Sequence, residues 1–320
     1  MGCGIISLAG QRLGFHLFNR FSMTIAWVFP GQGSQKVGMT SSIMSLSGAK
    51  ERFSIASSIL GRDLLGICNG ERPDNADILD LNDTRNTQPA LFVVESLLVD
   101  DLFRQGRKPN FIAGHSLGEI VALYAGGVLD IQTSLNLLKT RSELMSEAGG
   151  GAMSAVMGFD RVQLNELVAS TEGVVIANDN SSNQVVLSGQ PDSVDNIINN
   201  LDCKRAIKLN VSGAFHSPFM SEAAHKFAIE LDKISFNNSH IPILSNSDPS
   251  PTSDGKILKS KLKDQMTSGV RWRETMEIML KEGVKTIVEI GPGSVLSGLA
   301  KRSMKGITAS QISNENDLGY

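Results

Sequence analysis

The chain has 320 residues, of which 41% are hydrophobic and 20% charged, and its formal net charge is -3. These values are ordinary for a soluble globular protein, and the near-neutral balance argues against nucleic acid as the main partner. No run approaches the roughly 18 apolar residues of a membrane span. The three cysteines, Cys3, Cys68 and Cys203, lie far apart, so the sequence predicts neither a disulfide framework nor a metal site.

The first 22 residues differ from the rest of the chain. They include Arg12 and Arg20 and no acidic residue. Such a leader is typical of a transit peptide, which would place the protein in the plastid stroma. We favour the other interpretation, an upstream start codon with Met23 as the true first residue, because a core strand follows at once. Residues 1–22 are therefore expected to lie outside the fold of a cytoplasmic protein.

The elements of the first half lead to one conspicuous turn. Residues 24–29 form an apolar, β-rich run that ends at a Pro-Gly loop, and residues 87–105 repeat leucine and valine at helical spacing. Thr87 is expected to cap this helix, with Pro89 in its first turn. A short strand at 109–116 then enters a helix at 118–129. Gly114-His115-Ser116-Leu117-Gly118 therefore stands in the strand-turn-helix context of a G-x-S-x-G nucleophile elbow.

A glycine cluster at 149–151 marks a domain boundary. Beyond it we expect strands at 152–159 and 184–189 and helices at 160–170 and 190–201, which favour a small α+β unit of the split βαβ kind. A polar surface loop is expected at 246–256. Further strands, at 241–246 and 286–290, fit a mostly parallel α/β sheet. The predicted large domain thus comprises residues 23–149 and 215–312, and the inserted small domain comprises residues 150–214.

Ser116 must be activated by other groups to act as a nucleophile. A free hydroxyl requires a base to accept its proton and donors to stabilise the oxyanion that forms. An elbow would expose the hydroxyl and aim the backbone N–H of Leu117 at that oxyanion. The alternative is an ordinary serine at a glycine-flanked turn.

Five histidines could supply the base. His16 lies in the leader, His115 should diverge from its neighbour Ser116, and His225 falls on a predicted helix. His240 precedes a strand. His216 lies in a Gly- and Pro-bounded loop beyond the small domain, where it could return to the serine, although a structural role for it remains open.

Six features occur in order, and one of them is Arg141, which lies 25 positions after Ser116. They are FPGQGSQ at 29–35, TQPAL at 87–91, GHSLGE at 114–119, GAFHS at 213–217, EIGPG at 289–293 and the arginine segment itself. From about residue 23 to about 310 the chain resembles the malonyl-CoA:acyl-carrier-protein transacylase family of type II fatty acid synthesis. It also resembles the acyltransferase domains of fatty acid and polyketide synthases. The resemblance implies an α/β-hydrolase-like large domain with an inserted ferredoxin-like small domain, and an active site between them.

The resemblance also implies roles for single residues. Ser116 is the acylated nucleophile and His216 its base. The backbone N–H groups of Gln32 and Leu117 form the oxyanion hole. Arg141 holds the malonyl carboxylate through its planar guanidinium, whereas its helical, charged context alone would favour an exposed position. Two further roles concern Gln265, whose backbone carbonyl orients the histidine, and Phe215, which limits room for a methyl branch.

The expected function is therefore transfer of malonyl from malonyl-CoA to the phosphopantetheine thiol of acyl carrier protein, with no cofactor or metal. The protein is expected to be a monomer. A serine thioesterase or esterase is the first alternative, with Asp179 or Asp202 available as a triad carboxylate. The others are a non-catalytic scaffold and an acyltransferase that serves a polyketide pathway in trans.

Overall fold

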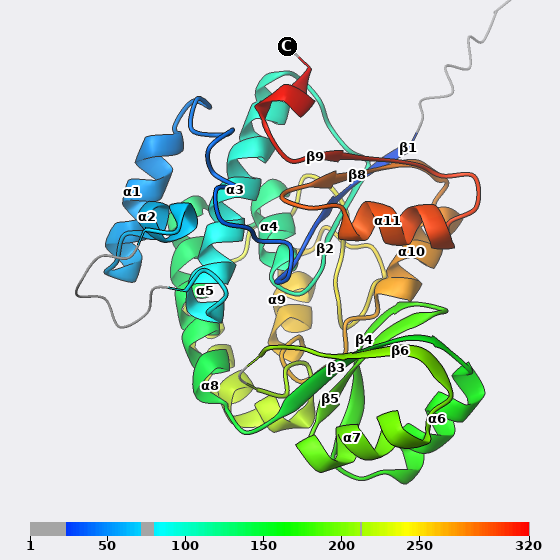
Figure 1. The fold of residues 1–320 in the computed structure, drawn as a ribbon. Coiled ribbons are helices and arrows are strands. Elements are labelled where there is room, and N and C mark those ends of the chain that lie inside the picture. Colours follow the sequence, from blue (N-terminus) through cyan, green and yellow to red (C-terminus); the bar gives the residue numbers. More distant parts are fainter. Residues whose placement is uncertain (1–23, 72–79, 212, 320) are drawn as a thin grey trace, which may run out of the picture.

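The computed structural model describes residues 24–71, 80–211 and 213–319, so the predicted leader, residues 1–22, lies outside the described part. The described chain forms two separate sheets. Figure 1 shows the larger, parallel sheet embedded among helices and the smaller sheet below it. No helix in the described ranges is both long and apolar enough to span a bilayer.

The first sheet has five parallel strands in the order β7-β2-β1-β8-β9. Their bounds are β1 Thr24–Phe29, β2 Phe111–Gly114, β7 Ile243–Leu244, β8 Val284–Ile290 and β9 Thr308–Ile312. Successive side chains on a strand point to opposite faces. Along β1, Trp27 and Phe29 therefore join the core on one face, and Ala26 and Val28 join the core on the other.

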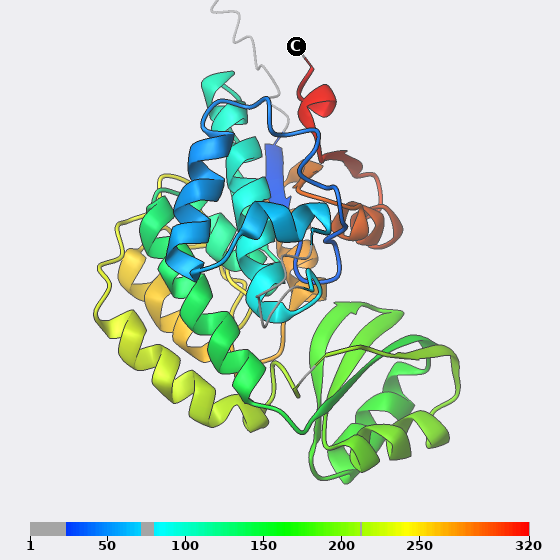
Figure 2. The ribbon, with the colours of Figure 1, turned by 60° about the vertical axis from the view of Figure 1, so that its left-hand side comes forward.

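Helices cover both faces of this sheet (Figures 1 and 2). One face carries α3 Thr84–Arg104 and α4 Gly118–Ala125, and the other carries α10 Trp272–Lys281 and α11 Val295–Ser303. Outside α3 and α4 pack α1 Ala49–Leu60, α2 Leu64–Asn69 and α5 Ile131–Glu147. Outside the antiparallel sheet and its two helices, the other helical segments of the described chain are α8 Ser221–Asp232, α9 Gly255–Asp264 and the short turns Pro218–Met220 and Glu315–Leu318. Because all five strands are parallel, their carboxyl ends meet at one edge, where ligand sites of such sheets form.

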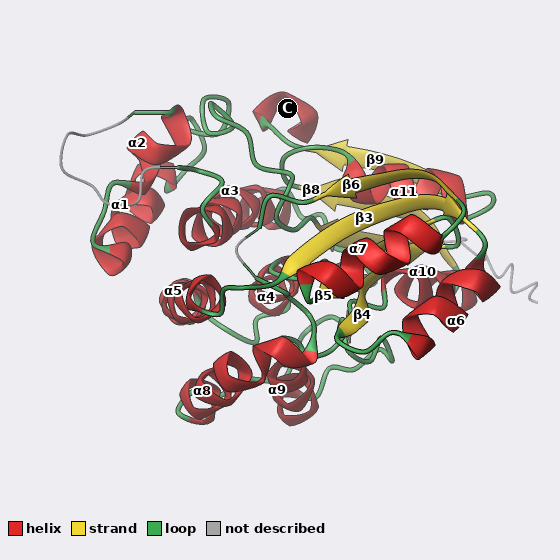
Figure 3. Cartoon of the chain, turned by 60° about the horizontal axis from the view of Figure 1, so that its bottom comes forward, coloured by secondary structure: helices red, strands yellow, loops and turns green. Residues whose placement is uncertain are grey.

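The second sheet is antiparallel, with the order β4-β5-β3-β6. Its elements are β3 Ala152–Phe159, α6 Arg161–Ser170, β4 Val174–Ser181, β5 Gln184–Gly189, α7 Pro191–Asn200 and β6 Cys203–Lys208. The two helices pack on one face of the sheet (Figure 3). This β-α-β-β-α-β order is that of a ferredoxin-like unit. Strand β4 was not among the elements predicted from the sequence. The residue boundaries that we predicted for the two domains remain a prediction.

Helix α3 begins three residues before the predicted start. Asp83, and not Thr87, is its N-cap, and the Asp83 carboxylate accepts from the Arg85 N–H. Pro89 lies in the second turn and has no N–H to donate to the Arg85 carbonyl four residues earlier. That carbonyl instead accepts from the Arg62 guanidinium at 2.6 Å. A side chain from another element therefore satisfies the acceptor that proline leaves open, and the helix continues.

The predicted fold class is confirmed: the protein is α/β, with a parallel sheet and a separate antiparallel sheet.

Candidate active site

Ser116 stands on a sharp turn between β2 and α4. Its φ of 52° lies in the left-handed region, which costs a residue with a side chain energy. The flanking glycines make the turn possible. A Cβ on Gly114 would lie 1.8 Å from the Gly118 carbonyl, and a Cβ on Gly118 would lie 2.3 Å from the Phe29 carbonyl oxygen. The G-x-S-x-G spacing is thus a steric requirement of this elbow.

His216 contacts the serine directly. Its Nε2 lies 2.8 Å from the Ser116 Oγ, and its Nδ1 lies 2.9 Å from the Gln265 backbone carbonyl oxygen. Because a carbonyl only accepts, Nδ1 carries the proton and Nε2 is free to accept from the serine hydroxyl. Burial and the nearby Arg141 cation lower the pKa of His216 to about 3. The imidazole is therefore a neutral base at ordinary pH.

Arg141 is buried beside the same hydroxyl and does not lie on an exposed helix face. Only 1% of its surface is accessible, and its Nη2 lies 3.2 Å from the Ser116 Oγ. Two neutral amides hold it: the Gln88 Oε1 accepts at 2.6 Å, and the Gln265 Oε1 accepts at 2.9 and 3.2 Å. Within the described ranges no carboxylate forms an ion pair with it.

Burial lowers the pKa of Arg141 to about 10, so the guanidinium stays charged at neutral pH. A buried cation whose hydrogen-bond partners are two neutral amides and a hydroxyl is suited to bind an anion.

Gln32, Leu117 and Phe215 line one cavity together with Ser116 and His216. The cavity has a volume of about 100 Å³ and also takes side chains from the antiparallel sheet, among them Met153 and Asn178. It therefore lies between the two sheets. The backbone N–H groups of Gln32 and Leu117 donate to no acceptor among the residues that the structure describes. They are available for an oxyanion.

Asn246 holds the elbow, a role that the sequence analysis missed. Its Oδ1 accepts from the Ser116 N–H at 2.7 Å, and its Nδ2 donates to the Gly114 carbonyl at 2.6 Å. We expected a polar surface loop from residue 246, yet the Asn246 side chain is buried. The available signal was its place just after the strand at β7, at the carboxyl edge of the sheet.

Gln88 and Glu119 lie within two of the sequence motifs, but the motifs gave no role for either residue. Gln88, from TQPAL, contacts Arg141 and donates to the Thr84 hydroxyl at 2.8 Å, which in turn donates to the Gln32 side chain. Glu119, the last residue of GHSLGE, is buried and accepts from the Gln265 side chain. Both connect residues that the motifs place far apart in the sequence.

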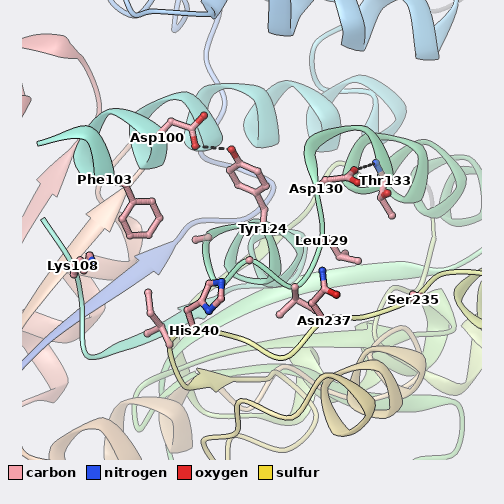
Figure 4. Close-up of a pocket in the computed structure, with 14 residues that line it drawn as sticks. Asp100, Phe103, Lys108, Tyr124, Leu129, Asp130, Thr133, Ser235, Asn237 and His240 are labelled. Carbon is pink, nitrogen blue, oxygen red and sulfur yellow. Dashed lines mark hydrogen bonds between the residues drawn. The ribbon is translucent and has the colours of Figure 1, made fainter. Parts of the chain in front are cut away.

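His115 also lines the cavity of Ser116, but neither it nor the other described histidines besides His216 hydrogen-bond to the Ser116 hydroxyl. His115 Nε2 lies 2.9 Å from the Asn180 Oδ1, and its ring packs against Trp272. His225 is exposed on α8. His240 lines a larger cavity of about 690 Å³ at the far end of α4, where Tyr124 donates to Asp100 (Figure 4). Neither the serine nor the arginine of the active site lines that cavity.

Comparison with known proteins identifies the family. The family profile described as "Acyl transferase domain" matches residues 26–319. The chain belongs to the acyl transferase domain family. A Synechocystis sp. protein named malonyl CoA-acyl carrier protein transacylase is 48% identical to this acyl transferase. The match covers 92% of this chain and 99% of the Synechocystis protein. The resemblance predicted from the motifs is therefore confirmed.

Solved structures agree with this assignment. The crystal structure of a malonyl-CoA:ACP transacylase from Synechocystis sp. matches the acyl transferase with a TM-score of 0.88 at 47% identity, over 92% of this chain and 99% of that chain. A malonyl-transacylase solved in complex with a type II PKS acyl-carrier protein matches with a TM-score of 0.85 at 34% identity, over 92% and 97% of the two chains.

Proposed function

We propose that this acyl transferase moves a malonyl group from malonyl-CoA to the phosphopantetheine thiol of acyl carrier protein, through a malonyl ester on Ser116. One observation carries the proposal: the Arg141 Nη2 lies 3.2 Å from the nucleophilic oxygen, buried and without an ion-pair partner among the described residues. A cation so close to the reacting atom favours an acyl group that brings its own carboxylate. The names of the relatives support the same substrate and acceptor.

The first half-reaction loads the serine. His216 Nε2 takes the Ser116 proton as the serine oxygen bonds to the thioester carbonyl carbon, while Arg141 holds the distal carboxylate. The oxyanion lies between the N–H groups of Gln32 and Leu117, and such a donor is worth about 10²–10³ in rate. The carbon–sulfur bond then breaks, and the coenzyme A sulfur leaves with the proton from His216.

The second half-reaction reverses these roles. His216 takes the proton of the phosphopantetheine thiol as its sulfur bonds to the malonyl carbonyl carbon. The ester bond to Ser116 breaks, and the proton returns to the serine oxygen. The proposed chemistry uses no cofactor. We further propose that Phe215, which lines the cavity, leaves little room for a methyl-branched malonyl group.

Hydrolysis is less well supported than transfer. A hydrolase triad would place a carboxylate at His216 Nδ1, and here that atom faces the Gln265 carbonyl. Asp179 forms ion pairs with Arg161 and Arg273, and Asp202 is exposed. The two carboxylates considered for a triad are thus not at the histidine.

We further propose that the protein is a cytoplasmic monomer that supplies fatty acid synthesis.

The test is malonyl transfer from malonyl-CoA to purified acyl carrier protein, followed by mass spectrometry of the carrier. Malonyl on the carrier supports the proposal. Release of free malonate at the same rate without carrier contradicts it and favours a thioesterase. Assaying the carriers of fatty acid and polyketide synthesis side by side separates the two pathways.

A further inference from the structure

Glu119 has no assigned role, yet it lies at the centre of the active-site hydrogen bonds. It sits in the first turn of α4, three residues after Ser116, and only 1% of its surface is accessible. Its Oε2 accepts from the Gln265 Nε2 at 2.7 Å and from the Asn246 backbone N–H at 3.1 Å. Its pKa is raised, because burial outweighs these hydrogen bonds and the Arg141 cation.

Gln265 connects this carboxylate to the guanidinium. Its Nε2 donates to the Glu119 Oε2 at 2.7 Å, and its Oε1 accepts from the Arg141 Nη2 at 2.9 Å. The second Nε2 proton goes to the Ser116 carbonyl at 3.0 Å, and the second Oε1 contact to the Arg141 Nε at 3.2 Å. The amide is therefore fully used on both sides.

Only one orientation of the Gln265 amide fits these neighbours. If it were rotated by half a turn, its NH2 group would face the donors of Arg141, and its oxygen would face the acceptors of Glu119 and Ser116. Unpaired buried donors and acceptors of this kind are costly. The acceptor at position 119, together with the Ser116 carbonyl, thus favours the orientation that presents oxygen to the arginine.

We propose that Glu119 is a positioning residue for acyl selectivity: through the Gln265 side chain it fixes Arg141 in the orientation that binds a malonyl carboxylate. The inference rests on the proposed function. Glu119 does not touch the substrate, and the backbone carbonyl of Gln265 orients His216 independently of the side chain. Loss of the acceptor at 119 therefore affects a carboxylate-bearing acyl group far more than a neutral one.

The experiment measures single-turnover acylation of Ser116 by malonyl-CoA and by acetyl-CoA, with intact mass as the readout. Glu119→Met removes the acceptor at similar length and should lower the malonyl-to-acetyl rate ratio by about 10- to 100-fold, the worth of a hydrogen bond to a charged group. Glu119→Gln can still present an amide oxygen to Gln265, so it should keep the ratio within about threefold of the original.

Two further variants separate the effect on acyl selectivity from any effect of the Glu119 substitution on folding. Gln265→Met keeps the backbone carbonyl and should lower the same ratio as Glu119→Met does. In an Arg141→Ala background, adding Glu119→Met should change the ratio no further, because the residue through which Glu119 acts is gone. If Glu119→Met fails to fold, as judged by thermal unfolding, Gln265→Met and Glu119→Gln together decide: the first must lower the ratio and the second must keep it.

The inference is overturned if Glu119→Met or Gln265→Met leaves the ratio unchanged, or if Glu119→Gln lowers it as far as methionine does. It is equally overturned if Glu119→Met lowers the ratio further without Arg141. The unmodified protein is assayed first. If it does not transfer malonyl, the proposed function has failed; if it does and the variants behave otherwise, only the role of Glu119 has failed.

Discussion

Ser116 and His216 are hydrogen-bonded to each other at 2.8 Å, and they are the two non-glycine residues with positive φ in the described ranges. Their φ angles are 52° and 55°. Each such conformation costs about 1–3 kcal/mol, and such strain is typical of functional sites. The fold thus stabilises two unfavourable backbone conformations that bring the proposed nucleophile and the proposed base together.

This strain predicts an unusual effect on stability. Ser116→Gly should relieve the left-handed conformation, whereas Ser116→Ala keeps it, and both lose the hydroxyl. We expect the glycine variant to be more stable than the alanine variant by about 1 kcal/mol in chemical denaturation. Equal stability of the two variants would mean that the elbow carries no strain.

The proposed binding of the malonyl carboxylate by Arg141 predicts which acyl groups the enzyme accepts. Arg141→Ala should lower the malonyl-to-acetyl ratio by at least about tenfold, because a charge-assisted contact is lost. Arg141→Lys should not restore it, since an ammonium group cannot reproduce the planar fork held by Gln88 and Gln265. Single-turnover acylation with each thioester measures both. A lysine variant with the original ratio would show that charge alone suffices.

The proposed role of His216 as the base predicts how the acylation rate depends on pH. His216 must be neutral to accept the serine proton, and its pKa is lowered from 6.5 to about 3. Protonation therefore inactivates it only near pH 3, so kcat/KM for acylation should stay flat between about pH 5 and 8. A rate that halves near pH 6.5 would contradict this.

The causes of the lowered His216 pKa provide a control for the same experiment. Burial is the main cause, and the Arg141 cation is the second. Arg141→Met removes that cation, so the acidic limb should move to higher pH while remaining below the value of an exposed histidine.

Asn246 should matter for both stability and rate. Asn246→Leu would leave the Ser116 N–H and the Gly114 carbonyl without partners, at a cost of about 1–3 kcal/mol in unfolding free energy. Acylation should slow as well, because the elbow loses its support. Asn199→Ala, at an exposed position on α7, is the matched control and should stay within about 0.5 kcal/mol of the unmodified protein.

Much of the fold was predictable because the local sequence pattern of many elements agrees with the structure that they adopt. The expected strands at 24–29, 152–159 and 184–189 match β1, β3 and β5 residue for residue. Their runs of branched and apolar residues between turn signals account for this. Strand β4 was missed because it contains Asn178, Asp179 and Asn180, which are rare in strands. Tertiary partners compensate: Asp179 pairs with Arg161, and Asn180 pairs with His115.

The parts of the site that were missed depend on contacts across the sequence. Asn246 accepts a hydrogen bond from the Ser116 N–H, 130 positions away in the sequence. Gln265 accepts one from Arg141, 124 positions away. No local pattern encodes such pairings. Motifs indicated the residues at the reacting atoms, whereas the amide and carboxylate side chains that hold them became visible only in the folded chain.

The central claim is that Ser116 carries malonyl between two thiols. The most direct measurement is intact mass of the protein after mixing with malonyl-CoA, and again after adding acyl carrier protein. We predict one malonyl adduct, absent in Ser116→Ala, that persists alone and moves to the carrier when it is added. An adduct that also forms in Ser116→Ala, or one that is released as malonate without carrier, would contradict the account.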